Sequence, residues 1–552
     1  MIEYTQQKGA IMDEFSIRKQ YLFPSFELSK EERHIFEKYY AFLDRSGVAE
    51  IIKRHIHNYT EAGGRPSVNY YNLFAVILYG FSCGRSTLRD LEDACGHDIR
   101  YIDIMEQVRP SYSTIANFIN NVIVPNEIEI FGAINRQIMK ELSIELDDAF
   151  VDGTKWEANA NKYKFVWKPI TYHKKLSATF FTILKENGLC ENFRVEELVK
   201  SSTVSKVLDV LKDNKDHFDI DRYESLCKSI SSILVKVLEY EEKERICGED
   251  RKSYYKTDHD ATAMCLKSDY YSGLGSNMHA AYSVQGLVIS GIIMAYYVSQ
   301  SRCDTIDFVP ILRLFHTIYG QYPKNVCADS AYGSLDNYRF LNDNGIGNYV
   351  KYFSWEGNVS GTYPDSYRLN EDGTILCLNR RIGIPVEIPH RHPKKPGGVF
   401  YMIEECDGCP FKDYCMRFMK NIDEQHYKIF EVVPEFLKLK QKAEENLLSV
   451  KGIEIRVNRS IQVEGVFGIA KQDIRYTRIR RRGMKKVSTE IMLTFLGLNL
   501  RRLLNYYNTG KKLAFWSAPD SLEPQQFKKL SAKRLSKKGK RINEKTYNFK
   551  QA

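Results

Sequence analysis

The chain is organised around residues 458–472, which read NRSIQVEGVFGIAKQ. The apolar residues of this stretch recur at a spacing that predicts a helix, and one carboxylate, Glu464, stands among them. Lys471 follows seven residues later, close to two full turns, so the carboxylate and the ammonium group would share one helix face. Such a face suits a site that binds a cation and a phosphate together. A solvated surface ion pair is the commoner reason for this spacing. The metal-site interpretation therefore requires other carboxylates that could lie close to Glu464.

Two further carboxylates follow predicted strands. Ala149 and Val151 alternate before Asp152-Gly153, a pattern typical of a strand that ends in a turn, and the short apolar run 325–328 precedes Asp329. An Asp at a strand end can present its carboxylate to a metal ion, although an Asp that only shapes the turn is commoner. A single sheet that brings both Asp residues to Glu464 would favour the metal site.

The order of predicted elements is that of a mixed α/β sheet with helices on its faces. We expect strands over 279–285 and 288–298 joined at Gly286, helices over 304–318, 337–344 and 489–504, and strands over 325–329 and 348–352. A helical insertion interrupts the sheet over about 160–270. Inside it, Asp258, His259 and Asp260 are candidate metal ligands, but Thr257-Asp258 equally suits a helix start.

Residues 1–145 are predicted to be helical. Helices are expected over 68–82 and 86–94, and Ser111-Tyr-Ser-Thr114 supplies N-cap chemistry for a third. Polar Ser113, Asn117 and Asn120 on that third helix favour a helix-turn-helix-like DNA-binding region. A plain helical bundle is the alternative.

A second insertion, residues 354–430, is rich in Gly, Pro and Arg and contains the only clustered cysteines. Cys406, Cys409 and Cys415 have the spacing of a metal-binding knuckle, and Cys377 is a candidate fourth ligand. Thiols so spaced in a cytosolic protein are metal ligands more often than disulfides, which predicts structural Zn²⁺. The alternative is a set of free thiols in a small β-rich lobe.

Basic residues gather after Glu464, although the net charge of +10 is moderate for 552 residues. This uneven distribution favours a polyanionic partner. The candidate DNA-binding residues are Arg475, Arg478, Arg480, Arg481, Arg482, Lys485 and Lys486, followed by a Lys-rich tail over 505–552. No apolar run approaches the roughly 20 residues of a membrane span, and the N-terminus lacks a signal-peptide pattern, so an intracellular protein is expected.

Several segments together carry a family resemblance: VDGTKWEANANKYKFVWK, KTDHDATAM, CADSAYGS and NRSIQVEGVFGIAKQ, then R-R-G-x-K-K-V and E-x8-N-L. They resemble the DDE transposases of bacterial insertion sequences, over residues 68 to 504. The resemblance implies a ribonuclease-H-like catalytic core in which Asp152, Asp329 and Glu464 form the acidic triad.

The same resemblance implies the cofactor and a departure. Two Mg²⁺ or Mn²⁺ ions would bind the triad, because hard cations prefer oxygen ligands, and Lys471 would neutralise phosphate charge. Related transposases often carry Tyr seven residues and Arg four residues before the Glu. Here those positions are Val457 and Ser460. Arg456 or Arg459 is the candidate to take over the phosphate contact.

The expected function is cleavage of DNA at insertion-sequence ends and strand transfer into target DNA. The partners would be double-stranded DNA, as terminal inverted repeats and target, and a second copy of the chain in a homodimer on DNA, in the bacterial cytoplasm at the nucleoid. The expected domains are 1–145 for DNA binding, 146–504 for catalysis and the basic tail 505–552. The alternatives are a domesticated nuclease without strand transfer and a non-catalytic DNA-binding protein, against which the intact acid set argues.

Overall fold

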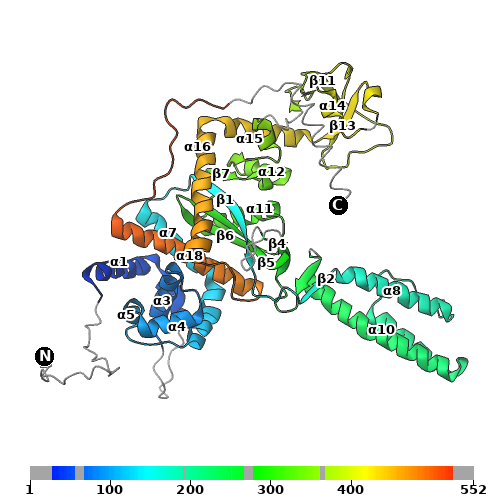
Figure 1. Ribbon diagram of the computed structural model, residues 1–552, viewed down its shortest axis with the longest axis horizontal. Helices are drawn as coiled ribbons and strands as arrows, with labels where there is room; N and C mark the ends of the chain where they lie inside the picture. Colours follow the sequence, from blue (N-terminus) through cyan, green and yellow to red (C-terminus); the bar gives the residue numbers. More distant parts are fainter. Residues whose placement is uncertain are drawn as a thin grey trace, which may run out of the picture.

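The chain has a central body from which a helical arm and a small β-rich lobe project (Figure 1). The structure is a computed structural model and describes residues 28–55, 68–189, 194–249, 251–266, 278–360, 367–419 and 421–525. The body is a mixed α/β assembly, as expected from the order of elements. No helix among the described residues is long and apolar enough to cross a membrane.

A mixed sheet forms the centre of the body. Its strands are β1 (Asp148–Glu157), β4 (Thr262–Cys265), β5 (Met278–Ile289), β6 (Ile292–Ser299), β7 (Asn325–Ala328) and β8 (Gly347–Val350). They are ordered β4-β5-β1-β7-β8, and β6 also pairs with β5. Strand β1 is antiparallel to β5 and parallel to β7, and β7 is parallel to β8. The strand that carries Asp152 therefore lies in the middle of the sheet.

The predicted turn after Asp152 is wrong. Strand β1 continues to Glu157, and Asp152 pairs with Gly286 of β5. Position 153 is a glycine for a different reason than a turn. A Cβ there would lie 2.5 Å from Oε1 of Gln285, the residue that pairs with Gly153 on β5. The glycine makes room for a side chain rather than for a turn.

The hairpin of β5 and β6 also turns at another place than expected. Strand β5 runs through Gly286 to Ile289, and the chain reverses at Ser290 and Gly291, which have φ values of 50° and 76°. Positive φ at both central residues is the requirement of a type I′ hairpin turn. Gly286 instead faces the Phe467 ring, whose Cζ would lie 3.2 Å from an added Cβ.

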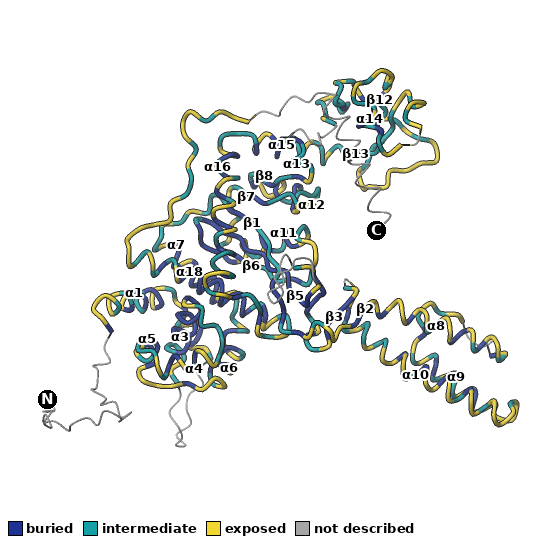
Figure 2. The backbone as a smooth tube through the Cα atoms, viewed as in Figure 1, coloured by how far each residue is buried: buried dark blue, intermediate teal, exposed yellow. Residues whose placement is uncertain are grey.

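Helices α11 (Phe308–Tyr319), α12 (Leu335–Asp343), α15 (Pro434–Leu448), α16 (Val450–Arg459) and α18 (Met484–Thr509) pack around the sheet. Most side chains of α18 from Val487 to Leu500 are buried, on every side of the helix. The sheet covers one side of α18 and the N-terminal helices cover another, so one hydrophobic core joins all three (Figure 2). This burial on all sides, rather than one apolar face, explains why α18 is poorly amphipathic.

The described residues before β1 contain helices only. These are α1 (Lys30–Ser46), α2 (Val48–Lys53), α3 (Tyr70–Ser82), α4 (Leu88–His97), α5 (Ile99–Ile104), α6 (Tyr112–Phe118) and α7 (Glu127–Leu142). The predicted cap of the third helix is confirmed, because Ser111 Oγ accepts the Thr114 N–H. Helix α3 approaches α18 so closely that a Cβ on Gly497 would lie 2.6 Å from the Phe81 backbone. The expected region boundary at 145 is therefore spanned by a shared core.

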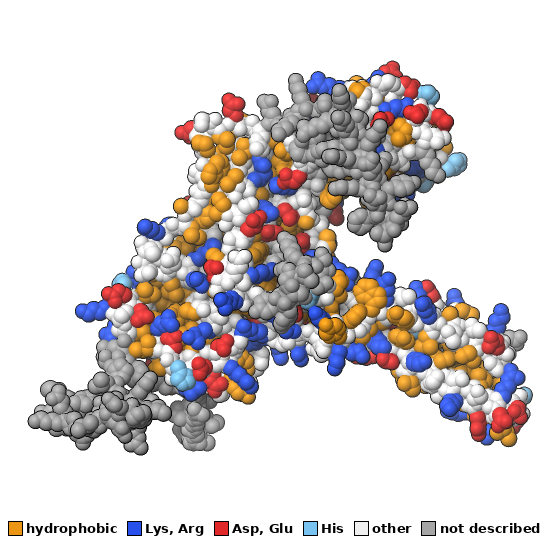
Figure 3. Space-filling view, viewed as in Figure 1, with side chains coloured by type: hydrophobic (Ala, Val, Ile, Leu, Met, Phe, Trp, Pro, Cys, Tyr) orange, Lys and Arg blue, Asp and Glu red, His pale blue; other side chains and the backbone are white. Residues whose placement is uncertain are grey.

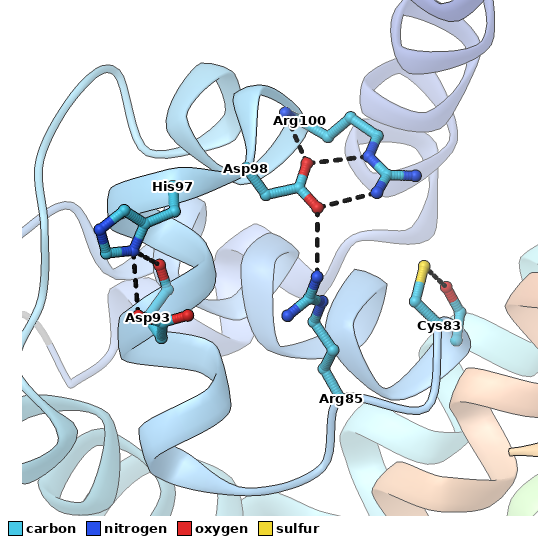
Figure 4. A network of polar contacts seen from close by, with 7 residues as sticks. Cys83, Arg85, Asp93, His97, Asp98 and Arg100 are labelled. Carbon is cyan, nitrogen blue, oxygen red and sulfur yellow. Dashed lines mark hydrogen bonds and ion pairs between the residues drawn. The ribbon is translucent and has the colours of Figure 1, made fainter. Parts of the chain in front are cut away.

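A small polar network fixes the turn between α4 and α5 (Figure 4). Asp98 caps α5 through the Arg100 N–H and accepts two bonds from the Arg100 guanidinium, at 2.9 and 2.8 Å, while Arg85 approaches at 3.5 Å. Burial alone would raise the pKa of Asp98, but the hydrogen bonds from Arg100 outweigh it and lower that pKa below its ordinary value. The turn is held by charge as well as by the cap.

The first insertion forms the arm. It contains α8 (Pro169–Glu186), α9 (Ser201–Asp213) and α10 (Ile220–Cys247), and the short pair β2 (Phe165–Trp167) and β3 (Ser253–Tyr255) lies at its base. The predicted helical spacing is confirmed, because Val204, Leu211, Leu226 and Ile230 lie in a small core of the arm's own.

The second insertion forms the β-rich lobe. Its elements are α13 (Trp355–Ser360), β9 (Arg368–Leu369), β10 (Ile375–Leu376), β11 (Ile382–Val386), β12 (Val399–Ile403), α14 (Lys412–Cys415) and β13 (Lys428–Val432). The strands form one sheet in the order β13-β12-β11-β10-β9. Most of the predicted basic tail, residues 526–552, lies outside the described residues, and α18 extends past the predicted end at Leu504 to Thr509.

Candidate catalytic site

Asp152 and Asp329 come from neighbouring parallel strands. In the register of β1 and β7, Phe150 lies opposite Cys327, so two residues further on Asp152 lies level with Asp329. Asp329 directly follows β7, as the sequence predicts, and its side chain accepts the Ala331 N–H at 2.9 Å. That bond caps the short turn Ser330–Tyr332 and holds the carboxylate at the strand end.

Glu464 lies on a continuous helical stretch, as predicted, but this stretch is not a regular α-helix. After α16 come a π-helical turn over Ser460–Glu464, α17 (Gly465–Gly468) and a second π-helical turn over Ile469–Asp473. Val463 and Phe467 are buried while Glu464 is exposed. Wider π turns change which residues face the sheet, and they are frequent at functional sites.

The three carboxylates share one electrostatic environment. The pKa of Asp152 is raised to about 6, chiefly by burial and also by the negative charges of Asp329 and Glu464, against the opposing effects of Arg459 and the Gly153 N–H. The fold therefore brings together the three acids that the sequence singled out. Within the described ranges, however, no group of three or more His, Cys, Asp or Glu side chains is arranged to hold a metal ion.

A guanidinium group lies where the charge of Asp152 must be balanced. Arg459 is the last residue of α16, and its Nη1 lies 3.7 Å from Asp152 Oδ2, with both side chains less than one-fifth exposed. This Nη1 makes no hydrogen bond to any described residue. Arg456 instead stacks on Trp355, 5.4 Å from the ring centre, and bonds Gln525. Of the two candidate arginines, the structure brings only Arg459 to the acids.

Lys471 reaches the strand of Asp152. Its ammonium group donates to Thr154 Oγ1 and lies over the Trp156 ring, 5.2 Å from the centre. Thr154 follows Asp152 by two residues, and residues so spaced on a strand point to the same side of the sheet. Lys471 therefore adds a positive charge beside the carboxylates.

The basic segment 475–486 is attached to the body by several polar contacts. Arg478 bonds the carbonyls of Ala158 and Ala160, and Arg482 bonds that of Asn159. Arg481 Nη1 lies 3.4 Å from Asn120 of the N-terminal region, and burial lowers the pKa of this arginine. Arg475, Arg480, Arg482, Lys485 and Lys486 are the exposed members of the predicted set. These exposed cations form a surface beside the end of β1.

Comparison with family models agrees with this arrangement. Residues 389–504, which contain Glu464, Lys471 and the basic segment, match the family described as "Transposase DDE domain". Residues 24–121, which contain α1 to α6, match "Transposase domain (DUF772)". These two matches support a DDE transposase of the insertion-sequence type. No match was found among curated proteins or among solved structures.

DDE transposase domains generally use divalent metal ions. The chemistry of the donor set suits such ions, because the three carboxylates supply the hard oxygen ligands that divalent cations prefer. Asp152 and Asp329 lie outside both matched ranges. Their assignment to the site therefore rests on the register of β1 and β7 and on the charge interaction between the carboxylates.

The candidate ligands Asp258 and Asp260 form structural hydrogen bonds in this fold. Asp258 accepts the Tyr282 hydroxyl at 3.0 Å and the Gly483 N–H at 3.2 Å, and Asp260 accepts the Met484 N–H at 2.7 Å. Asp260 therefore satisfies the first N–H of α18, and Asp258 holds the residue before it. His259 packs edge-on against Tyr254. Residues 257–260 form turns rather than the helix start that was the alternative.

The four candidate zinc ligands line one cavity of about 30 Å³ in the β-rich lobe, together with Tyr367 and Lys428. Burial raises the pKa of the Cys406 thiol, and neighbouring Cys409 and Cys377 raise it further. Burial likewise raises the pKa of Cys415 to about 11. The fold thus gathers thiols that are up to 38 residues apart in sequence, and all four are free thiols.

Sequence reasoning missed the residues that support the site. Gln285 Nε2 bonds Ser283 and Asp304, and its Oε1 accepts the hydroxyl of Tyr332, which follows Asp329 by three residues. Glu490 accepts the N–H groups of Arg480 and Arg481 and the Tyr476 hydroxyl. The motif E-x8-N-L contained Glu490, but only the fold shows that it holds the basic segment.

Proposed function

We propose that this transposase cleaves DNA at the ends of its element and joins the freed 3′ ends to target DNA, using Asp152, Asp329 and Glu464. The observation that carries the proposal is the convergence of the three acids on Asp152, whose pKa both neighbouring carboxylates raise. Transposases act on DNA, and the exposed basic segment beside β1 supplies cations for a phosphate backbone.

The catalytic roles follow from where each side chain lies. Asp152, in the middle, would bridge two Mg²⁺ or Mn²⁺ ions, while Asp329 and Glu464 would each complete one site. Such ions supply activation of the attacking oxygen and stabilisation of the leaving oxygen. Lys471, held on Thr154, would neutralise phosphate charge next to the carboxylates, and Arg459 is the arginine placed to contact the same phosphate.

The architecture supports a ribonuclease-H-like catalytic core. Its central strand β1 has the antiparallel hairpin β5-β6 on one side and the parallel strands β7 and β8 on the other, with helices around the sheet. We assign catalysis to 146–504, DNA binding to the helical region 1–145 and unspecific contact with polyanions to the tail 505–552. In α6, Ser113 and Asn117 are exposed for such contacts.

The partners proposed are the terminal inverted repeats, the target duplex and a second copy of the chain. Two element ends must be cut and joined together, and a homodimer assembled on DNA would provide one catalytic site for each end. A gel-filtration measurement with and without an end-bearing duplex tests this part separately.

We also propose that Cys377, Cys406, Cys409 and Cys415 bind structural Zn²⁺. Thiolates are the ligands that Zn²⁺ prefers in closed sites, and the four thiols line one small cavity. The expected result is one zinc per chain by elemental analysis, lost in Cys409→Ser but kept in Cys265→Ser, which alters an exposed cysteine elsewhere. Wild-type protein without zinc would contradict the assignment.

The decisive experiment for the function compares Asp152→Asn with Asp147→Asn. Asp147 is a carboxylate five residues earlier that pairs with Lys324 at the surface. With Mg²⁺ and a duplex that carries an element end, Asp152→Asn should lose cleavage and strand transfer but keep end binding, while Asp147→Asn keeps all three. Cleavage by purified Asp152→Asn would refute the assignment.

The two alternative functions give different results in the same assay. A nuclease without transposition would cut the duplex but join nothing to a target plasmid. A non-catalytic DNA-binding protein would bind ends and cut neither substrate with any divalent ion.

A further inference from the structure

Exposed aromatic side chains gather at the base of the helical arm. Tyr163, Phe165, Trp167 and Tyr172 are 81%, 48%, 39% and 50% exposed. They account for four of the eight exposed large aromatic residues among the described ones, within ten positions of sequence. We call these four residues the aromatic ribbon. Large aromatic rings are costly to leave in water, so such a cluster marks a binding surface.

The backbone explains why the ribbon stays open. In β2, Val166 points inward against Cys247 and Tyr254, so its neighbours Phe165 and Trp167 point to the opposite face. Strand β2 pairs only with β3, in a sheet of two strands. No third strand extends that sheet within the described residues.

Cations accompany nearly every ring of the ribbon. Lys162 lies 5.3 Å from the centre of the Tyr163 ring, Lys168 5.5 Å from Trp167 and Lys175 5.8 Å from Tyr172. Residues 158–176 contain five lysines and no Asp or Glu. Figure 3 shows hydrophobic and basic side chains interleaved along the face of the arm that is in view, with acidic ones toward its tip. A surface of flat rings with cations beside them is complementary to nucleobases and their phosphates.

The ribbon is linked to β1 on the side of the sheet opposite to the Asp152 side chain. Lys155, three residues after Asp152, donates to the Arg302 carbonyl at 3.1 Å, and the Arg302 guanidinium lies 6.0 Å from the Trp167 ring. The segment between β1 and β2 is also bonded by Arg478 and Arg482. The ribbon and the basic segment 475–486 are therefore both attached to the chain at the end of β1.

We propose that the aromatic ribbon binds an unpaired DNA strand next to the catalytic site by stacking bases on its rings. Bases offer a free face to a ring only when they are not stacked in a duplex, which selects single-stranded over double-stranded DNA. The proposal rests on the proposed function for its place in the reaction, because DNA cleavage at an end produces unpaired nucleotides. Binding itself requires no cleavage.

The test uses full-length Asp152→Asn protein, which binds without cutting, and two probes: a labelled oligo-dT strand and a blunt duplex of equal length. Trp167 also serves as a reporter, because Trp156 and Trp355 are buried and Trp516 is half-buried. Oligo-dT should quench tryptophan fluorescence. Trp167→Ala should bind oligo-dT about 5-fold to 150-fold more weakly than the parent protein, the range expected for loss of one stacked base. Its affinity for the duplex should stay within about twofold of the parent value.

Controls separate stacking from general effects. Trp167→Phe, which keeps a ring, should restore most of the affinity, and Tyr427→Ala removes an exposed ring of the β-rich lobe and should change nothing. Equal weakening for oligo-dT and duplex, or no weakening, would overturn the proposal. Tryptophan fluorescence per molecule that changes with protein concentration in the absence of DNA would also overturn the proposal. It would indicate that the aromatic ribbon contacts a second copy of the chain. This test measures binding and not cleavage. A failure of the ribbon proposal can therefore be told apart from a failure of the Asp152 assignment.

Discussion

Arg459 forms an ion pair with Asp152, with 3.7 Å between Nη1 and Oδ2. This contact crosses from the end of α16 to the central strand of the sheet, and neither side chain is more than one-fifth exposed. The guanidinium balances a charge that burial and two neighbouring carboxylates disfavour. Divalent ions bound by the acids would balance that charge instead and would leave the arginine available to a phosphate.

Replacing Arg459 by Gln should slow cleavage strongly. Loss of one charged donor aimed at a reacting phosphate typically costs on the order of 100-fold in rate, and we expect that magnitude at saturating Mg²⁺ with little change in end binding. Arg456→Gln is the matched control, because Arg456 stacks on Trp355 instead. Single-turnover cleavage measurements check this prediction. If Arg456→Gln cleaves more slowly than Arg459→Gln, the phosphate contact belongs to Arg456 and the assignment to Arg459 is wrong.

The metal-free protein should lose stability as the pH rises. An Asp at its ordinary pKa of 3.8 titrates in the unfolded chain, whereas folded Asp152 titrates at about 6. The folded state therefore holds the extra proton between these values, and ionisation above them lowers the free energy of unfolding by about 3 kcal/mol at pH 7.

Asp152→Asn should remove this loss. Chemical denaturation should show the variant more stable than wild type at pH 7 and nearly equal at pH 4. Added Mg²⁺ should stabilise wild type at pH 7 and leave the variant unchanged. A variant that is less stable at pH 7 would contradict the raised pKa.

Gly153→Ala should destabilise the protein by about 1–3 kcal/mol through overpacking. The added Cβ would lie 2.5 Å from Gln285, which is fully buried and bonded to its neighbours. Gly468→Ala is the control: nothing lies within 4 Å of its added Cβ, and a helical alanine should gain about 0.5–1 kcal/mol. Thermal unfolding of both variants checks the contrast.

Glu490→Gln should weaken DNA binding although Glu490 does not face solvent. The side-chain amide would place a donor against the Arg480 or Arg481 N–H, which costs about 1–3 kcal/mol and loosens the basic segment. Asp473→Asn removes the same charge from an exposed position. Anisotropy titrations in which both variants bind DNA equally well would show that Glu490 has only a general role in stability.

The sequence by itself determined the local features of this protein. Ser111 caps its helix, Asp329 ends its strand and the stretch 458–472 is helical, because each depends on residues a few positions apart. The same holds for the apolar spacing in the arm. The motifs and the family resemblance also single out Asp152, Asp329 and Glu464, although the sequence shows no contact between them.

Tertiary structure decided what those features do. Gly153 and Gly286 looked like turn residues, yet they make room for Gln285 and Phe467, which come from other elements. Asp258 and Asp260 accept N–H groups at the start of a helix that begins more than 200 residues later. Arg456 and Arg459 are equivalent in sequence, and only the direction of α16 sends Arg459 to the acids. Such contacts depend on how distant segments pack, which no local pattern encodes.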